Sequence, residues 1–286
     1  MRWKGRRQSD AVEDRRGQGM GRPLAIGGIG TLVVLGIALF LGADPSQLLN
    51  MLGQMQGAGP AATEQGPAPG NDEARQFVAT VLADTEEVWG DIFEDNGRTY
   101  ERPRLILYSG RTEMPGGVAD AATGPFYYPT DQTVYLDFSF FDEMKHRLNA
   151  PGDFAAAYVI THEVGHHVQH LLGVTERVQT LRQRVPEVEA NQLLVRLELQ
   201  ADFYAGVWAY HAQQRWNIIE EGDVEEALNA ANAIGDDRLQ KQARGVVVPD
   251  AFTHGTSAQR VRWFTKGLRG GDPADGDTFS VPYEQL

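Results

Sequence analysis

Cysteine is absent from this chain of 286 residues, and basic residues are scarce after position 22. Without cysteine there can be no disulfide bond, cysteine nucleophile, thiolate zinc site or lipid-modified N-terminal cysteine. Removing the seven basic and three acidic residues of positions 1–22 from the totals of 26 and 39 leaves a net charge of −17. Such a surface repels nucleic acid. No glycine-rich segment has the strand and helix context of a phosphate-binding loop, so we expect no nucleic-acid partner and no nucleotide cofactor.

The motif H-E-x-x-H occupies residues 162–166. Apolar residues recur at intervals of three and four across residues 153–172, which predicts an amphipathic helix around the motif. On a helix, His162 and His166 project from one face and can bind a single zinc ion. Glu163 lies beside them and can take a proton from a water molecule. The alternative interpretation is a pair of hydrogen-bonded core histidines.

Two carboxylates, Glu198 and Asp202, lie four residues apart in the otherwise apolar stretch 193–208. Carboxylates on one face of a buried helix are costly unless a metal ion or another cation neutralises them. We therefore predict Glu198 as the third ligand, since a catalytic zinc has three protein ligands. Asp202 is predicted to accept the second ring N–H of a ligating histidine. The alternative is that both carboxylates lie at the solvated edge of the helix.

The H-E-x-x-H motif followed by E-x-x-x-D resembles the gluzincin metallopeptidases. Further segments carry a closer resemblance, namely MRWKGRRQSDAVEDRRG, GPFYYPTDQTVYLDFSFFD, YVITHEVGHHVQHLLG, ELQADFYAGVW, EEALNAANAIGDDRLQ and PDAFTHGTSAQRVRWF. Through them most of the chain, apart from about residues 22–70, resembles the bacterial family called "putative neutral zinc metallopeptidases". The resemblance implies a zincin-like fold, a Zn²⁺ cofactor and peptide-bond hydrolysis, with Glu198 as the third ligand and Asp202 supporting a histidine.

This chain departs from that family in its missing cysteines. Relatives carry cysteines near residues 114–116 and 276 and at the equivalents of Tyr128 and Phe203, and all four are missing here. Their joint absence implies that paired disulfides were lost together. Every predicted metal ligand remains in place.

The segment F-T-H-G-T-S-A-Q-R-V-R-W-F contains a further catalytic candidate, His254, followed six residues later by Arg260. This spacing is similar to the H-P-x-x-x-x-R element of membrane-linked zinc peptidases related to the CAAX-processing protease, although Gly255 replaces the proline. The resemblance implies that His254 donates a hydrogen bond to the developing oxyanion, with Arg260 positioning it. The alternative is a histidine near a helix N-terminus without a catalytic role.

Residues 24–42 form a long apolar run of nearly the 20 or so residues that a helix needs to span a bilayer. Seven basic residues precede it against three acidic ones, which predicts a cytoplasmic N-terminus. A cleaved signal peptide is the competing interpretation, but the run is long and Leu41 is unsuited to a cleavage site. We therefore expect a single-pass protein of the bacterial inner membrane with an extracytoplasmic catalytic domain.

Four segments follow from this division of the chain. They are a basic cytoplasmic arm (1–23), a transmembrane helix (24–42), a flexible linker rich in Gly, Pro, Ala and Gln (43–70) and a metallopeptidase-like domain (71–286).

The domain itself is predicted to be of the α+β class, with an active-site helix and a small sheet. Residues 102–108 and a hairpin of residues 126–128 and 133–138 are predicted strands, the last with one covered face. In the zincin fold that the resemblance implies, an edge strand holds the peptide substrate, and residues 133–138 are the candidate, although an ordinary core strand fits them equally. Helices are predicted over residues 72–94, 153–172 with Asp153 as cap, 188–216, 224–244 and 257–268.

Taken together, the residues predict a membrane-anchored zinc metallopeptidase acting on exported or membrane-associated peptides or proteins. His162, His166 and Glu198 are the predicted ligands, Glu163 the general base and His254 the oxyanion donor. The alternative function is a non-catalytic, zinc-stabilised membrane protein that binds partners or regulates another protease. Such a protein would not need Glu163.

Overall fold

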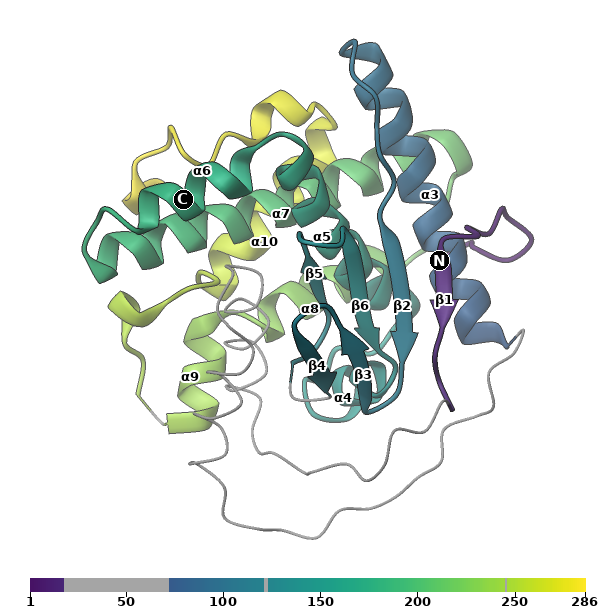
Figure 1. The fold of residues 1–286 in the computed structure, drawn as a ribbon, viewed down its shortest axis with the longest axis horizontal. Helices are drawn as coiled ribbons and strands as arrows, with labels where there is room; N and C mark the ends of the chain where they lie inside the picture. The colour runs from purple at the N-terminus through teal and green to yellow at the C-terminus, as the bar shows by residue number, and fades with distance from the viewer. Residues whose placement is uncertain (18–71, 121–122, 245) are drawn as a thin grey trace, which may run out of the picture.

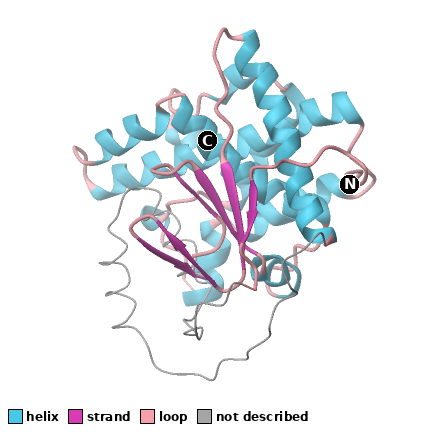
Figure 2. Ribbon diagram, turned by 45° about the vertical axis from the view of Figure 1, so that its right-hand side comes forward, coloured by secondary structure: helices cyan, strands magenta, loops and turns pink. Residues whose placement is uncertain are grey.

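A computed structural model describes residues 1–17, 72–120, 123–244 and 246–286. Within these residues, a four-stranded sheet and a two-stranded hairpin lie beside a larger group of helices (Figures 1 and 2). The strands are β1 (Val12–Asp14), β2 (Arg104–Tyr108), β3 (Arg111–Met114), β4 (Gly117–Asp120), β5 (Phe126–Tyr128) and β6 (Thr133–Asp137). The helices are α3 (Glu73–Asp95), α4 (Ser139–His146), α5 (Asp153–Leu171), α6 (Val174–Arg182), α7 (Glu187–Trp216), α8 (Asp223–Ala233), α9 (Asp236–Arg244) and α10 (Ser257–Gly270). The predicted α+β class is confirmed.

The four-stranded sheet has the order β1-β2-β6-β5, with β5 antiparallel to β6 and the other pairs parallel. Leu105 and Leu107 enter the main core, whereas the intervening Ile106 packs with the β3–β4 hairpin. Both faces of the sheet are therefore covered, and β6 is buried at every position. Of the two alternatives for residues 133–138, the core strand is confirmed, because β6 is an inner strand and β5 is the edge that contacts α5. The prediction that only one face of this strand is covered is wrong.

Two predicted helices differ from their predicted form. α5 begins at Asp153, but the preceding glycine is its N-cap, and the Asp153 carboxylate instead contacts the terminal ammonium of Met1 at 2.6 Å. The single helix predicted over residues 224–244 is two helices, α8 and α9. A Cβ atom at Gly235, between them, would lie 2.4 Å from the backbone nitrogen of Ser257. The helix breaks where another part of the chain crosses it closely.

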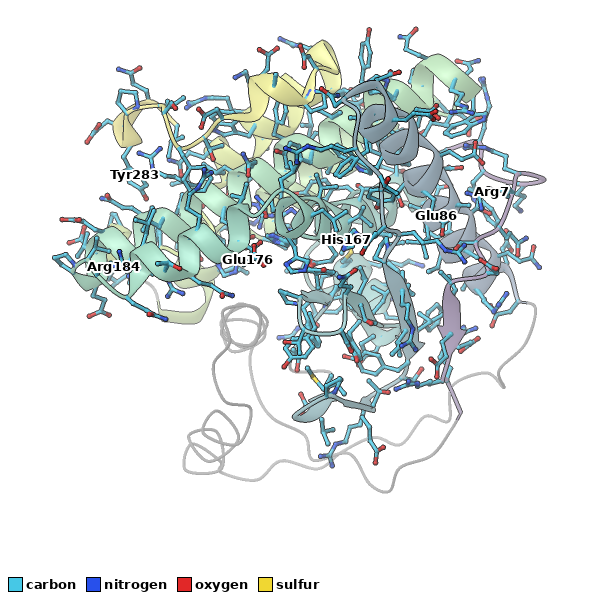
Figure 3. All side chains as sticks on the ribbon, turned by 45° about the horizontal axis from the view of Figure 1, so that its top comes forward. Arg7, Glu86, His167, Glu176, Arg184 and Tyr283 are labelled. Carbon is cyan, nitrogen blue, oxygen red and sulfur yellow. The ribbon has the colours of Figure 1, made fainter. Side chains whose placement is uncertain are left out.

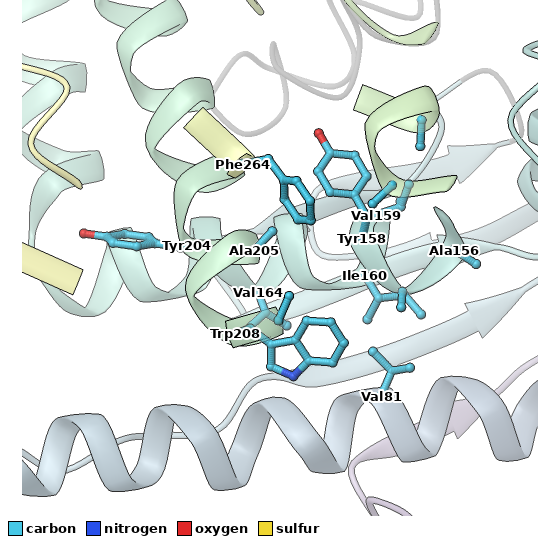
Figure 4. Packing of buried hydrophobic residues seen from close by; sticks show 14 of the residues in the cluster. Val81, Ala156, Tyr158, Val159, Ile160, Val164, Tyr204, Ala205, Trp208 and Phe264 are labelled. Atoms are coloured by element: carbon cyan, nitrogen blue, oxygen red, sulfur yellow. The ribbon is translucent and has the colours of Figure 1, made fainter. Parts of the chain in front are cut away.

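Helices α5, α7 and α10 approach one another at glycines. A Cβ atom at Gly165, inside the H-E-x-x-H motif, would lie 2.9 Å from the carbonyl oxygen of Ala201 in α7. A Cβ atom at Gly206 of α7 would lie 2.2 Å from the carbonyl oxygen of Phe264 in α10. Tyr158 and Phe264 pack in the buried cluster around these crossings (Figure 4). The close α5–α7 contact sets the motif beside the carboxylates of α7.

Residues 1–17 pack against the domain through apolar and charged contacts. Strand β1 pairs in parallel with β2, and Trp3 packs edge-on against Phe77 of α3, with ring centroids 5.5 Å apart. Nη2 of Arg7 lies 2.9 Å from Oε2 of Glu86, also in α3 (Figure 3). This segment is therefore a structural part of the domain.

The predicted single-pass localisation, with a cytoplasmic N-terminus and an extracytoplasmic domain, is wrong. No helix among the described residues is long and apolar enough to cross a bilayer. The basic segment and the domain, predicted to lie on opposite sides of the membrane, share one sheet. Residues 24–42 and 43–70, the predicted span and linker, lie outside the described residues, as does the predicted domain boundary at residue 71.

Asp84 of α3 joins residues 1–17 to the domain and is expected to make stability depend on pH. Its Oδ1 atom accepts a hydrogen bond from Nη2 of Arg6 at 2.6 Å. Burial raises the pKa of Asp84 to about 7, because the attraction of Arg6 offsets only part of the cost of a buried carboxylate. Between about pH 4 and pH 7 the folded state therefore keeps a proton that the unfolded state has released. Asp84 thus lowers the free energy of unfolding as pH rises through this range.

Asp84→Asn is expected to remove the contribution of Asp84 to this fall in the free energy of unfolding, which is on the order of 1–3 kcal/mol. Urea denaturation at a series of pH values measures it. Asp91→Asn, at an exposed position of the same helix, is the control and should follow the native profile. If Asp84→Asn followed the native profile as well, the raised pKa would be contradicted.

Candidate metal centre

Two histidines of α5 and one carboxylate of α7 converge in the interior. Nε2 of His162 lies 3.2 Å from Oε2 of Glu198, and Nε2 of His166 lies 3.3 Å from Oε1 of Glu198. The three candidate ligand atoms lie within 4.8 Å of one another, and all three side chains are buried. A tetrahedral zinc ion with bonds of about 2.0–2.1 Å separates its ligand atoms by about 3.3 Å. The donor set and its spacing therefore fit zinc.

Each of these two imidazoles is held at its other ring nitrogen. Nδ1 of His162 lies 2.9 Å from Oδ1 of Asp202, and Nδ1 of His166 lies 2.8 Å from Oε1 of Gln169. Gln169 in turn donates a hydrogen bond to the carbonyl oxygen of Leu197 at 2.7 Å. A histidine that donates from Nδ1 presents the Nε2 lone pair to a metal. Gln169 was not predicted from the sequence, where only its place one turn after His166 could have indicated it.

Asp202 is fully buried and is shared by several donors. Nε and Nη2 of Arg260 lie 2.8 Å from Oδ2 and 2.9 Å from Oδ1, and the Tyr158 hydroxyl lies 2.5 Å from Oδ1. Burial would raise the pKa of Asp202, but Arg260 and His162 hold it below its ordinary value. Arg260 was predicted to position His254. Its described side-chain contacts are with Asp202, Tyr158 and the His162 ring instead.

Glu163 lies beside the three converging side chains but does not belong to that group. Burial raises the pKa of its carboxyl group, whereas His162 and His166 oppose that rise. The backbone N–H of Tyr127, in edge strand β5, donates a hydrogen bond to the carboxylate. Glu163 is thus a buried, oriented group that can accept a proton.

His254 is buried on the loop before α10. Its Nδ1 atom lies 3.1 Å from Oδ1 of Asp236 and 3.0 Å from the Thr253 hydroxyl. Burial would raise the pKa of Glu198, but His166, His162 and, more weakly, His254 hold it well below its ordinary value. His254 therefore lies close enough to act electrostatically on the metal centre. Asp236 could not be predicted from the sequence, because no motif links it to His254.

Other histidines of α5 have structural contacts. Nδ1 of His167 lies 2.9 Å from the Tyr127 hydroxyl, and its Nε2 lies 2.5 Å from the carbonyl oxygen of Glu101 (Figure 3). Burial lowers the pKa of His167 to about 4, so the ring is neutral at ordinary pH. His170 lies toward the surface, where its Nδ1 atom is 2.5 Å from Oε1 of Glu176.

Known proteins resemble the whole chain. The family model described as "Putative neutral zinc metallopeptidase" matches residues 1–279. The uncharacterized protein YpfJ of Escherichia coli (strain K12) is 50% identical over 291 residues, which cover 98% of this chain and 99% of the relative. The uncharacterized protein Rv2575 of Mycobacterium tuberculosis (strain ATCC 25618 / H37Rv) is 40% identical over 266 residues, or 85% of each chain. No solved structure matches the chain significantly. The chain therefore belongs to the "Putative neutral zinc metallopeptidase" family.

Proposed function

We propose that this protein is a zinc-dependent peptidase that hydrolyses peptide bonds in a peptide or protein substrate. The observation that carries the proposal is the convergence of His162, His166 and Glu198 beside a further buried carboxylate, Glu163, that is not needed as a ligand. A structural zinc site would have no use for this carboxylate. Family membership supports the same class of function.

In this proposal, His162, His166 and Glu198 hold the metal. A zinc ion bound there would act as a Lewis acid toward the scissile carbonyl and lower the pKa of water. Glu163 accepts a proton from the attacking water and returns it to the leaving amine. His254 donates a hydrogen bond to the carbonyl oxygen as negative charge develops on it.

Around these groups, neighbouring side chains keep the two histidine ligands in place. Asp202 and Gln169 fix the two imidazoles, and Arg260 balances the charge of Asp202. The backbone of β5 is the proposed surface for an extended substrate, because β5 is the edge strand of its sheet and contacts the active-site helix.

The experiment that tests the activity compares new peptide termini in a bacterial protein extract. The extract is incubated with the zinc-loaded protein, with the protein after chelation, and with the chelated protein after zinc is returned. New termini are expected in the first and third samples only. Equal termini in all three would show that zinc is not required, and no new termini in any sample would favour a partner-binding protein.

One zinc ion per chain is expected to bind, and Glu198→Ala, His162→Ala and His166→Ala should each reduce the zinc content of the purified protein to near zero. Loss of one of three protein ligands leaves too few donors for tight binding. Elemental analysis with circular dichroism measures zinc content and folding together.

The control for these ligand variants is His170→Ala, which changes a histidine of the same helix that contacts Glu176 near the surface. It should retain one zinc ion. A folded Glu198→Ala protein with full zinc content would refute the assignment of the third ligand.

A further inference from the structure

We propose that Asp236 is a positioning residue that fixes the ring orientation and the proton position of His254. The inference rests on the proposed peptidase function, in which His254 donates to the developing oxyanion. Arg260, the residue that sequence spacing suggested for this task, is instead occupied by Asp202. Asp236 is the carboxylate that contacts His254.

Both oxygens of the Asp236 carboxylate contact the segment that carries His254. Oδ1 lies 3.1 Å from Nδ1 of the ring, while Oδ2 accepts the backbone N–H groups of His254 and Thr253 at 2.6 and 2.7 Å. The backbone N–H of Asp236 donates to the carbonyl oxygen of Gly255 at 2.9 Å. Asp236 is 7% exposed, so water offers little competition for these bonds. The side chain therefore holds the loop and the ring at once.

The same loop packs directly on the helix that supplies Glu198. A Cβ atom at Gly255, which has a φ of +83°, would lie 3.2 Å from the side chain of Val195 and 3.3 Å from that of Leu199. In α7, Leu199 is next to Glu198 and Val195 lies about one turn before Glu198. Asp236 thus connects the first turn of α9 to a loop that lies against the metal centre.

The neighbouring Asp237 performs the simpler structural task. Its Oδ1 atom accepts the backbone N–H and the hydroxyl of Ser257 at 2.8 and 2.9 Å. No described hydrogen bond joins Asp237 to the His254 ring. The two adjacent aspartates hold the same loop, but only Asp236 reaches the imidazole, which makes Asp237 a matched control.

Replacing Asp236 with asparagine has a specific chemical consequence. The two backbone N–H groups that face Oδ2 need an acceptor, so the amide oxygen is expected to turn toward them. The amide NH₂ then faces Nδ1 of His254, which must become an acceptor. In the native protein the Asp236 carboxylate accepts the Nδ1–H while the Nε2–H donates to the oxyanion, so the donating ring carries both protons and a positive charge. With asparagine the ring loses the Nδ1 proton and keeps only that on Nε2, which makes it a neutral and weaker donor.

Nuclear magnetic resonance of ¹⁵N-histidine-labelled, zinc-loaded protein measures this proton position at one fixed pH. The signals of His254 are identified by their absence from the His254→Ala spectrum. We expect a protonated Nδ1 in the native protein and in Asp237→Asn, and an unprotonated Nδ1 in Asp236→Asn. An unprotonated Nδ1 in the native protein, or no change in Asp236→Asn, would overturn the proposal.

Kinetics with a peptide substrate chosen from the extract experiment supply the second measurement. Asp236→Asn should lower kcat about 10- to 100-fold with a smaller change in KM, since the contact to the oxyanion matures in the transition state. Asp237→Asn should remain near native. In a His254→Ala background, Asp236→Asn should cost little more, because both changes act through one group.

Additive losses in the double variant would show that Asp236 acts elsewhere and would overturn the proposal. Failure of the peptidase function has a different signature. In that case the native protein would produce no zinc-dependent termini, while the resonance experiment would still decide whether Asp236 sets the proton position of His254.

Discussion

Glu163→Gln is expected to lose nearly all peptide hydrolysis while zinc content and stability stay at the native level. Glutamine has nearly the same shape and can still accept the hydrogen bond from the Tyr127 backbone N–H, but it cannot take a proton from water. General-base catalysis typically raises the rate roughly 10²- to 10⁴-fold, so kcat should fall by roughly 10²-fold or more. KM should change little, because proton transfer occurs after substrate binds.

The measurements for Glu163→Gln are steady-state kinetics, zinc analysis and urea denaturation on the same preparation. Glu176→Gln, which changes an exposed glutamate beside His170, is the control and should keep native turnover. If Glu163→Gln cleaved the substrate at the native rate, another group would have to be the base. If it lost zinc, Glu163 would be a ligand rather than a proton acceptor.

Arg260→Ala is expected to lower the free energy of unfolding by about 3–5 kcal/mol, the cost of leaving a buried charge without its partner. Arg260 is 2% exposed, and two of its nitrogens contact the fully buried Asp202. The Tyr158 hydroxyl and His162 would remain as partners for Asp202, but neither supplies a permanent positive charge. Most of the lost stability should therefore come from the buried Asp202 carboxylate, which is left without a positively charged partner.

Urea denaturation of the zinc-loaded protein measures the effect of Arg260→Ala. Arg215→Ala, which removes an exposed pair with Asp91, is the control and should cost no more than about 1 kcal/mol. The double variant Arg260→Ala, Asp202→Asn should recover part of the stability, because it removes the unpaired charge. A loss below 1 kcal/mol in Arg260→Ala would show that water or another group reaches Asp202 easily.

The candidate ligand set could be predicted from the sequence because each of its parts is a pattern of residues close together in the chain. The four-residue spacing of His162 and His166 places them on one helical face, and Glu198 with Asp202 repeats that spacing in an apolar helix. Each pair is a local pattern. Only the crossing of α5 and α7 at Gly165 had to be supplied by the fold.

Predictions from the sequence failed where segments far apart in the chain pack against each other. Charge and hydropathy assigned residues 1–23 and the domain to opposite sides of a membrane, yet β1 pairs with β2 and Trp3 packs on Phe77. The alternation in residues 133–138 fitted a strand with one covered face and left an edge strand and a core strand equally possible, because strand order depends on long-range pairing that local alternation does not contain.

By itself, the sequence determined the α+β class, the main helices, the candidate ligands His162, His166 and Glu198, and the candidate base Glu163. Tertiary structure alone decided which side chains contact the histidine rings, namely Gln169 for His166 and Asp236 for His254. It also placed Arg260 in contact with Asp202, whereas the sequence had suggested that Arg260 positions His254. The physical reason is that helical spacing fixes which residues share a face, whereas hydrogen bonds between buried polar groups depend on how separate helices and loops pack.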